Sequence, residues 1–125
     1  MIHGPRTFIF TVPAPCKFIN SNDRLHHHAK AELTRAWRQA AANEAKRVIA
    51  GIGLTIPVRI TAAINKPGNR RWDPNNLAPT TKACVDGIVD AGVIPDDSWR
   101  EVVGPDHRRG TAAPDSITFT IEELV

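Results

Sequence analysis

The chain has 125 residues, which is an ordinary size for one domain, and 42% of them are apolar, which is enough for a hydrophobic core. Sixteen Lys and Arg against thirteen Asp and Glu give a net charge of +3, a mild basic excess that permits an anionic partner without demanding one. No stretch approaches the roughly 18 apolar residues of a membrane span, and the N-terminus lacks the pattern of a secretory signal. We therefore expect a single domain over residues 1–125, cytoplasmic and without a membrane partner.

The first half of the chain predicts a strand, a helix and a second strand. Residues 7–12 (TFIFTV) are rich in β-branched and aromatic residues and are followed by prolines, which is typical of a strand and its end. Apolar residues recur at intervals of three and four over residues 28–50, which predicts a helix with Trp37 in the core, ended by glycines. Residues 54–64 (LTIPVRITAAI) alternate as a second strand.

The second half predicts a helix over residues 79–91, with Pro79 in the first turn and Gly92 after the end. Short strands near residues 100–104 and 115–122 complete a β-α-β-α-β-β order, an α/β or α+β domain whose strand order the pattern leaves open. The expected apolar side of the second helix consists of Leu77, Thr81, Cys84, Val85 and Ile88, and its polar side of Lys82, Asp86 and Asp90 at i,i+4 spacing.

The cysteines and histidines do not indicate a metal centre. Cys16 and Cys84 belong to no C-x-x-C pair, so we expect two reduced thiols, with Cys84 buried as a small apolar side chain. Three consecutive histidines at 26–28 point around a helix rather than at one point, which favours a solvated helix start over a ligand set.

Acidic residues flank the second predicted helix. Asp73 follows a strand and Asp97 follows the helix, and such a path can return both to one edge of a sheet. Mg²⁺ prefers oxygen ligands and takes one or two carboxylates, so these two acids with the amide of Asn75 or Asn76 form a candidate site. Lys82 would then meet a phosphate oxygen. The alternative is that the acids are only turn and helix-flanking residues.

The loop before Asp73 is basic and carries the sequence KPGNRR. Such a loop is most often simply solvated, but beside carboxylates it could hold phosphates. Trp72 and Trp99 lie within two residues of proposed ligands, and packing is favoured over stacking on a base for both.

The segments RRWDPNNL and KACVDGIVDAGVIPDD resemble the RusA family of Holliday junction resolvases from bacteria and their phages. That family has an aspartate, a second acid two residues later, Asn-Leu, a lysine that opens a K-A-x-x-D-[AG]-L helix, an A-G turn and a terminal D-D. The proline-rich PAPCKFINSNDR loop is also similar, and the resemblance covers about residues 8–122 in the same element order. It implies a RusA-like fold with a small mixed sheet packed by two helices.

The resemblance implies roles for individual residues. Asp73 matches the first metal-binding aspartate, Asp97 the last, with Asp96 beside it, and Lys82 the catalytic lysine. The family's middle acid is Asn75 here, a neutral and weaker ligand, and an insertion, APT, lies between Leu77 and Lys82. The expected catalytic residues are Asp73, Asn75, Lys82 and Asp97, and the expected metal ligands are Asp73, Asn75, Asp96 and Asp97.

The activity implied by the resemblance is that of a homodimeric endonuclease, dependent on Mg²⁺ with Mn²⁺ as a substitute, that nicks opposed strands of a four-way DNA junction in a bacterial cell. Two alternatives stay open: a branched-DNA-binding dimer that Asn75 has left catalytically weak, and a structural dimer in which Lys82, Asp86 and Asp90 form only helix salt bridges. By position, the basic residues expected to hold DNA phosphates are Lys66, Arg70, Arg71, Arg100, Arg108 and Arg109.

Overall fold

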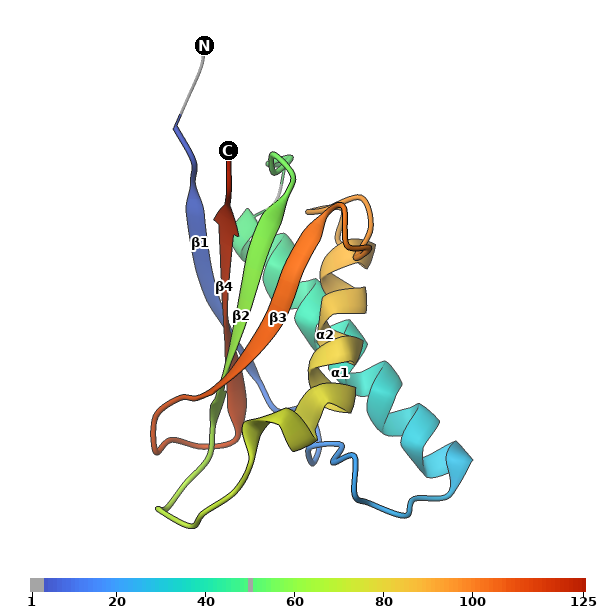
Figure 1. The fold of residues 1–125 in the computed structure, drawn as a ribbon. Helices are drawn as coiled ribbons and strands as arrows, with labels where there is room; N and C mark the ends of the chain where they lie inside the picture. Colours follow the sequence, from blue (N-terminus) through green and yellow to red (C-terminus); the bar gives the residue numbers. More distant parts are fainter. Residues whose placement is uncertain (1–3, 50) are drawn as a thin grey trace.

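The computed structural model describes residues 4–49 and 51–125 and confirms the predicted order of elements. Residue 50, the expected last residue of the first helix, lies outside the described residues. The class is α+β, with two helices against a mixed sheet (Figure 1). The elements are β1 (Thr7–Pro13), α1 (His27–Ile49), β2 (Val58–Asn65), the 3₁₀ helix η1 (Pro74–Leu77), α2 (Ala78–Asp90), β3 (Val102–Arg109) and β4 (Ser116–Glu123).

The four strands lie in the order β1-β4-β2-β3. Strand β4 pairs antiparallel with both β1 and β2, whereas β2 and β3 are parallel. Parallel neighbours need a crossover, and η1 with α2 provides it. The segment that carries the candidate site is therefore the crossover between two adjacent strands.

The start of β2 differs from the prediction, because the strand begins at Val58 rather than at residue 54. Pro57 has no N–H to give to a ladder. The preceding residues satisfy their backbone elsewhere: the N–H of Thr55 donates to Glu123 Oε2 at 2.6 Å, and the N–H of Leu54 donates to the carbonyl of Val93 at 3.4 Å. Residues 54–57 thus form a connection rather than a strand.

Strand β3 also differs, because it continues to Arg109 instead of ending at residue 104. Its pairing with β2 shifts register between Arg59 and Thr61 and then resumes. Gly104, with a φ of 104°, accommodates the irregularity. Arg108 and Arg109, which are beyond the predicted end of the strand, therefore lie in β3.

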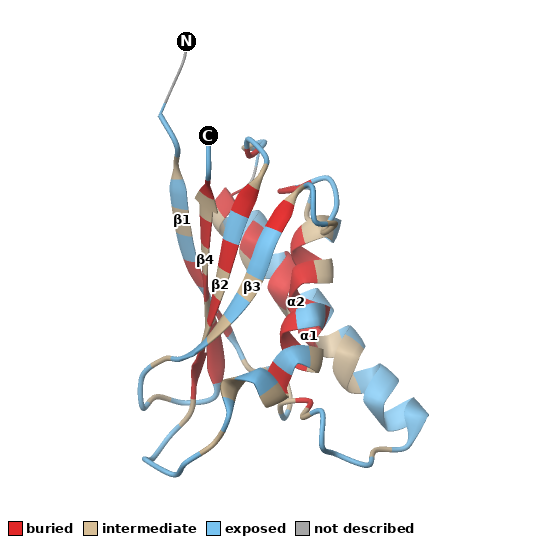
Figure 2. Cartoon of the chain, viewed as in Figure 1, coloured by how far each residue is buried: buried red, intermediate tan, exposed pale blue. Residues whose placement is uncertain are grey.

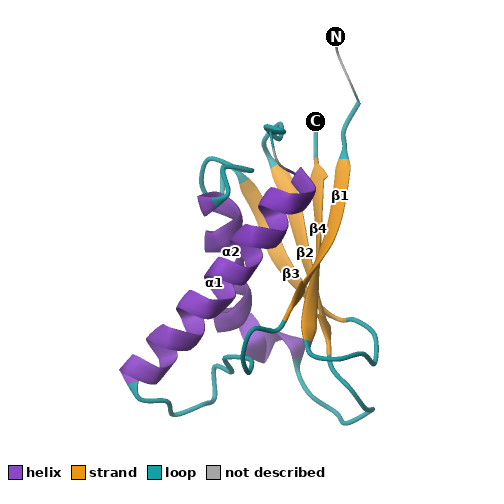
Figure 3. Cartoon of the chain, turned by 180° about the vertical axis from the view of Figure 1, so that it is seen from behind, coloured by secondary structure: helices purple, strands orange, loops and turns teal. Residues whose placement is uncertain are grey.

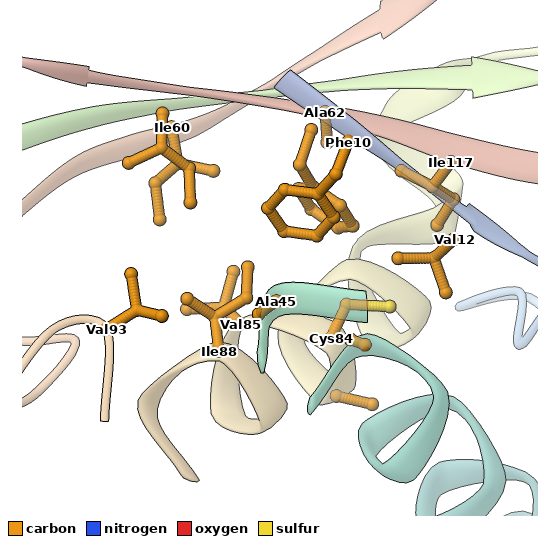
Figure 4. Packing of buried hydrophobic residues seen from close by; sticks show 14 of the residues in the cluster. Phe10, Val12, Ala45, Ile60, Ala62, Cys84, Val85, Ile88, Val93 and Ile117 are labelled. Carbon is orange, nitrogen blue, oxygen red and sulfur yellow. The ribbon is translucent and has the colours of Figure 1, made fainter. Parts of the chain in front are cut away.

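Both helices cover one face of the sheet (Figure 3), and buried residues occur in both layers (Figure 2). Hydrophobic side chains from the strands and the helices pack between the two layers (Figure 4). Trp37 and Cys84 are fully buried, as predicted, and both cysteines are free. The helices approach closely at Gly87, where an added Cβ would lie 2.1 Å from the carbonyl oxygen of Arg38. The absence of a side chain at Gly87 therefore allows α1 and α2 to pack in direct backbone contact.

The start of α1 lies at the surface. The histidines at 26–28 are exposed at the start of α1, as expected for a solvated helix start. Among the described residues, no helix is long and apolar enough to span a bilayer.

Candidate active site

Lys82 bridges two carboxylates on the exposed side of α2. Its Nζ lies 2.7 Å from Asp86 Oδ1, one helical turn later, and 2.6 Å from Asp97 Oδ2. Asp97 belongs to the connection between α2 and β3, and its backbone N–H donates to Asp96 Oδ1 at 2.8 Å. The structure thus brings the lysine and the terminal Asp-Asp pair of the segment together, 15 residues apart in sequence.

The bridge keeps its charges at neutral pH. The hydrogen bonds to Asp86 and then to Asp97 raise the pKa of Lys82 above its ordinary value. The hydrogen bond from Lys82 lowers the pKa of Asp97 in turn. The Lys82 ammonium therefore already neutralises Asp97, the carboxylate that the sequence predicts as a metal ligand.

The third polar residue of α2 takes no part in this bridge. Asp90 accepts two hydrogen bonds from Arg38 of α1, at 2.5 and 2.8 Å. The predicted polar stripe of α2 is present, but its members serve two separate ion-pair groups.

Asp73 caps the 3₁₀ helix at the other end of the segment. Its Oδ1 accepts a hydrogen bond from the N–H of Asn75 at 2.9 Å, and its carbonyl accepts one from the N–H of Asn76 at 3.0 Å. The Asn75 side chain is exposed and, within the described chain, makes no hydrogen bond of its own. Asp73 therefore has a helix-flanking role, as the alternative reading predicted, and this role leaves its second carboxylate oxygen available.

His107 of β3 is a residue that the sequence prediction missed. It pairs with Ala62 of β2, a core residue, so its side chain lies on the helix-covered face, where Nε2 is 2.7 Å from Thr81 Oγ1 of α2. Burial lowers its pKa, while the carboxylates of Asp106 and Asp73 act in the opposite direction. His107 thus lies within the electrostatic reach of Asp73.

His107 also lines a pocket of about 180 Å³ between α2 and β3, and so do Lys82 and Asp97. Of the two acids that flank the segment, Asp97 lines this pocket, whereas Asp73 does not and is related to it only through its electrostatic effect on His107. Apolar groups form most of the wall, and the complete lining is Ala78, Thr81, Lys82, Val85, Asp97, Val102, Gly104, Pro105 and His107.

The side chains predicted as metal ligands are of the types that a hard cation prefers. Three carboxylates, of Asp73, Asp96 and Asp97, and the amide oxygen of Asn75 are all oxygen donors, which Mg²⁺ and Mn²⁺ prefer. Within residues 4–49 and 51–125, however, no three His, Cys, Asp or Glu side chains lie close enough together to hold an ion. The residue types therefore fit the ion, but the described side chains are not gathered around one point.

The basic residues predicted to hold DNA differ in their exposure and in their contacts with the rest of the protein. Arg70, Arg71, Arg100 and Arg108 are exposed. Lys66 is half-buried, with Nζ 4.9 Å from the ring centroid of Trp72. Arg109 donates to Gly68 O at 3.4 Å and to Asn69 Oδ1 at 3.5 Å, which joins the KPGNRR loop to the end of β3.

The two tryptophans near the site differ. Trp72 packs against the core, as predicted. Packing was the wrong prediction for Trp99, which is 82% exposed and makes its ring contact with Arg100, whose guanidinium carbon lies 5.4 Å from the ring centroid. Its indole is available to a partner.

No family model matches the chain. Curated relatives do match. The crossover junction endodeoxyribonuclease RusA of Escherichia coli strain K12 is 32% identical over 97 residues, which are 74% of this chain and 75% of the relative. The corresponding protein of Enterobacteria phage 82 is 34% identical over the same shares, and that of Shigella sonnei strain Ss046 is 31% identical.

Proposed function

The chain belongs to the RusA family of crossover junction endodeoxyribonucleases, and on this premise we propose that it cuts four-way DNA junctions with a divalent metal ion as a homodimer in the bacterial cytoplasm. The observation that carries the proposal is the bridge of Lys82 to Asp86 and Asp97. It joins the lysine and the acid that the family pattern calls catalytic, beside a pocket on the crossover.

Asp73, Asn75, Asp96 and Asp97 would hold the ion, which would supply positive charge to the phosphate and lower the pKa of an attacking water. The carboxylate of Asp97 cannot serve a metal and the ammonium of Lys82 equally well, so ion binding would weaken their contact. Asp86 would then keep Lys82 on the same side of α2, where its ammonium can donate to a phosphate oxygen as charge develops there.

The surrounding basic side chains would hold the DNA backbone without reading its sequence. The exposed residues Arg70, Arg71, Arg100 and Arg108 are available for this, while Lys66 and Arg109 also hold the KPGNRR loop in place. A two-fold dimer would present two such sites to a branched substrate with two equivalent phosphates.

A second candidate function is binding of branched DNA with little or no cleavage. Asn75 carries an amide where the family pattern has an acid, and in the described part of the chain no metal-holding group of three side chains is assembled. An amide cannot offset the charge of a metal ion as a carboxylate does.

The test incubates the protein with a labelled four-way junction and with a linear duplex of the same sequence, with Mg²⁺, with Mn²⁺ and with EDTA. We expect paired nicks on opposed strands, in the junction only, that require the metal and disappear in Asp73→Asn. Junction binding without nicks would favour the second candidate, and equal binding to both DNAs would contradict both.

The variant Asn75→Asp separates the two candidates further. If the amide attenuates a working site, the added carboxylate raises Mn²⁺ affinity in calorimetry and raises the cleavage rate with it. A rise in Mn²⁺ affinity while the rate falls would show that Asn75 serves the reaction in another way. Asn69→Asp, in the basic loop, controls for the change of charge.

A further inference from the structure

We propose that the pocket between α2 and β3 binds one nucleobase of the DNA substrate, unstacked beside the phosphate that is cut. The inference rests on the proposed function, because the pocket shares Lys82 and Asp97 with the candidate active site. It adds a base-binding site to a surface whose other expected contacts are to the phosphate backbone.

The position of the pocket limits what can enter it. Lys82 lines the pocket, so a phosphate that contacted its ammonium would bring the flanking nucleotides next to the pocket. Exposed groups stand at the mouth, since Ala78, Lys82 and Gly104 are all accessible to solvent. The space is therefore open on the side from which a DNA strand would approach.

The walls suit a flat ring. Val85 of α2 faces Val102 and Pro105 of β3 across the pocket, so most of the lining is apolar. Gly104 adds a stretch of wall without a side chain, and a Cβ there would lie 2.6 Å from the carbonyl oxygen of Ile60. Apolar walls with a few polar groups are typical of sites that hold a flipped base.

Thr81 and His107 give the pocket a polar edge. The Thr81 hydroxyl donates to the carbonyl of Ala78 at 3.1 Å, and Thr81 is 1% exposed. A hydroxyl has one proton, so when it is given to the Ala78 carbonyl, Oγ1 accepts from Nε2–H of His107 at 2.7 Å. In that tautomer Nδ1 of His107 is a hydrogen-bond acceptor. Such an edge favours a base that presents an amino group.

The volume of the pocket matches the size of one nucleobase. About 180 Å³ is room for one base and is too small for a stacked pair or for a protein side chain together with a base. Withdrawing one base from an arm of the junction costs unstacking and unpairing energy, which the contacts in the pocket would offset.

The test places 2-aminopurine, whose fluorescence rises when it leaves the base stack, at each nucleotide flanking the mapped nick of a four-way junction. Binding is measured in EDTA so that no strand is cut. We expect the wild-type protein to raise the fluorescence severalfold at one of these positions.

Ala78→Phe fills the mouth of the pocket and should abolish this rise in fluorescence. It should change the junction Kd by no more than about 3-fold, because backbone contacts dominate affinity. Ala31→Phe makes the same change on the exposed side of α1 and should behave as wild type.

A second variant tests the polar edge. Single-turnover cleavage is measured on four junctions that differ only in the base at the responsive position. In His107→Ala the ratio of the fastest to the slowest of the four cleavage rates should be roughly 10-fold smaller than in the wild type.

If the wild type binds and cuts junctions but the fluorescence rises at no flanking position, the pocket proposal is wrong and the proposed function stands. The same conclusion follows if Ala78→Phe gives the wild-type rise in fluorescence. If the wild type neither binds nor cuts junctions, both are wrong.

Discussion

Helix α2 carries two ion-pair groups that look alike in the sequence and differ in the structure. At its C-terminal end, Asp90 receives two hydrogen bonds from the guanidinium of Arg38, which ties α2 to α1. Nearer its N-terminus, Lys82 contacts Asp86 and Asp97, and Asp97 comes from the connection that follows the helix.

The two ion-pair groups of α2 differ in the geometry of their contacts and in the elements around them. The Arg38–Asp90 pair is a two-pronged contact between packed helices, a geometry that gives rigidity. Lys82 is a point charge on a flexible stem shared by two acids, and it lines a pocket. Residue type and i,i+4 spacing therefore do not separate a pair that joins two helices from a pair that lines a pocket, whereas the neighbouring elements do.

The largest expected effect is on cleavage in Lys82→Gln. We expect the single-turnover rate on a four-way junction to fall about 100-fold or more, the usual cost of losing one transition-state donor. The thermal midpoint should change little, because the single contacts of an exposed lysine contribute less to stability than a bidentate Arg–carboxylate pair such as Arg38–Asp90. Arg38→Gln is the matched control on the other ion-pair group, and a Lys82→Gln protein that cuts at the wild-type rate would contradict the assignment.

The next effect is on stability, in Gly87→Ala at the contact between the helices. The added Cβ would lie 2.1 Å from a backbone oxygen, which cannot move without separating α1 from α2. We expect the free energy of unfolding, measured with urea, to fall by about 3 kcal/mol. Gly53→Ala, where a Cβ would meet nothing within 4 Å, should be close to neutral.

A smaller effect is expected from Arg38→Gln. The thermal midpoint should fall by a few degrees, because the contact between α1 and α2 loses both hydrogen bonds to Asp90. Cleavage by the folded protein should stay within about 2-fold of wild type, because the pair lies outside the pocket lining. In a double-mutant cycle with Asp90→Asn, strictly additive losses would show that the two side chains do not interact.

The smallest effect is a dependence of stability on pH. The hydrogen bond from Arg38 lowers the pKa of Asp90, so the stabilisation is complete above the ordinary aspartate value and is lost as the pH falls through the lowered value. The difference in thermal midpoint between wild type and Asp90→Asn should therefore begin to close below about pH 4. A difference that stays constant down to pH 2 would mean that this charge does not stabilise the fold.

Local signals were sufficient to predict α2 and its two sides. Pro79 lies in the first turn, Gly92 follows the end with a φ of 78°, and the five predicted apolar positions are all buried. These features depend on the helix itself and on its period of 3.6 residues. The spacing of Lys82 to Asp86 follows from the same period.

Features that depend on distant segments could not be predicted. The extent of β3 depends on its pairing with β2 beyond Gly104, where Gly-Pro in the sequence indicates an end. Because the strand was predicted to stop there, His107 was missed. The pairing of Asp90 with Arg38, 52 residues away, likewise needs the packing of the two helices.

The most direct test of the account compares two aspartate variants on one junction, Asp97→Asn and Asp90→Asn, in single-turnover cleavage with Mg²⁺. Each removes one negative charge that faces a cation at the surface of α2. We predict that Asp97→Asn loses cleavage by at least about 100-fold while Asp90→Asn stays within about 2-fold of wild type. Equal rates in the two variants, or a greater loss in Asp90→Asn, would contradict the assignment of the active site to Lys82 and Asp97.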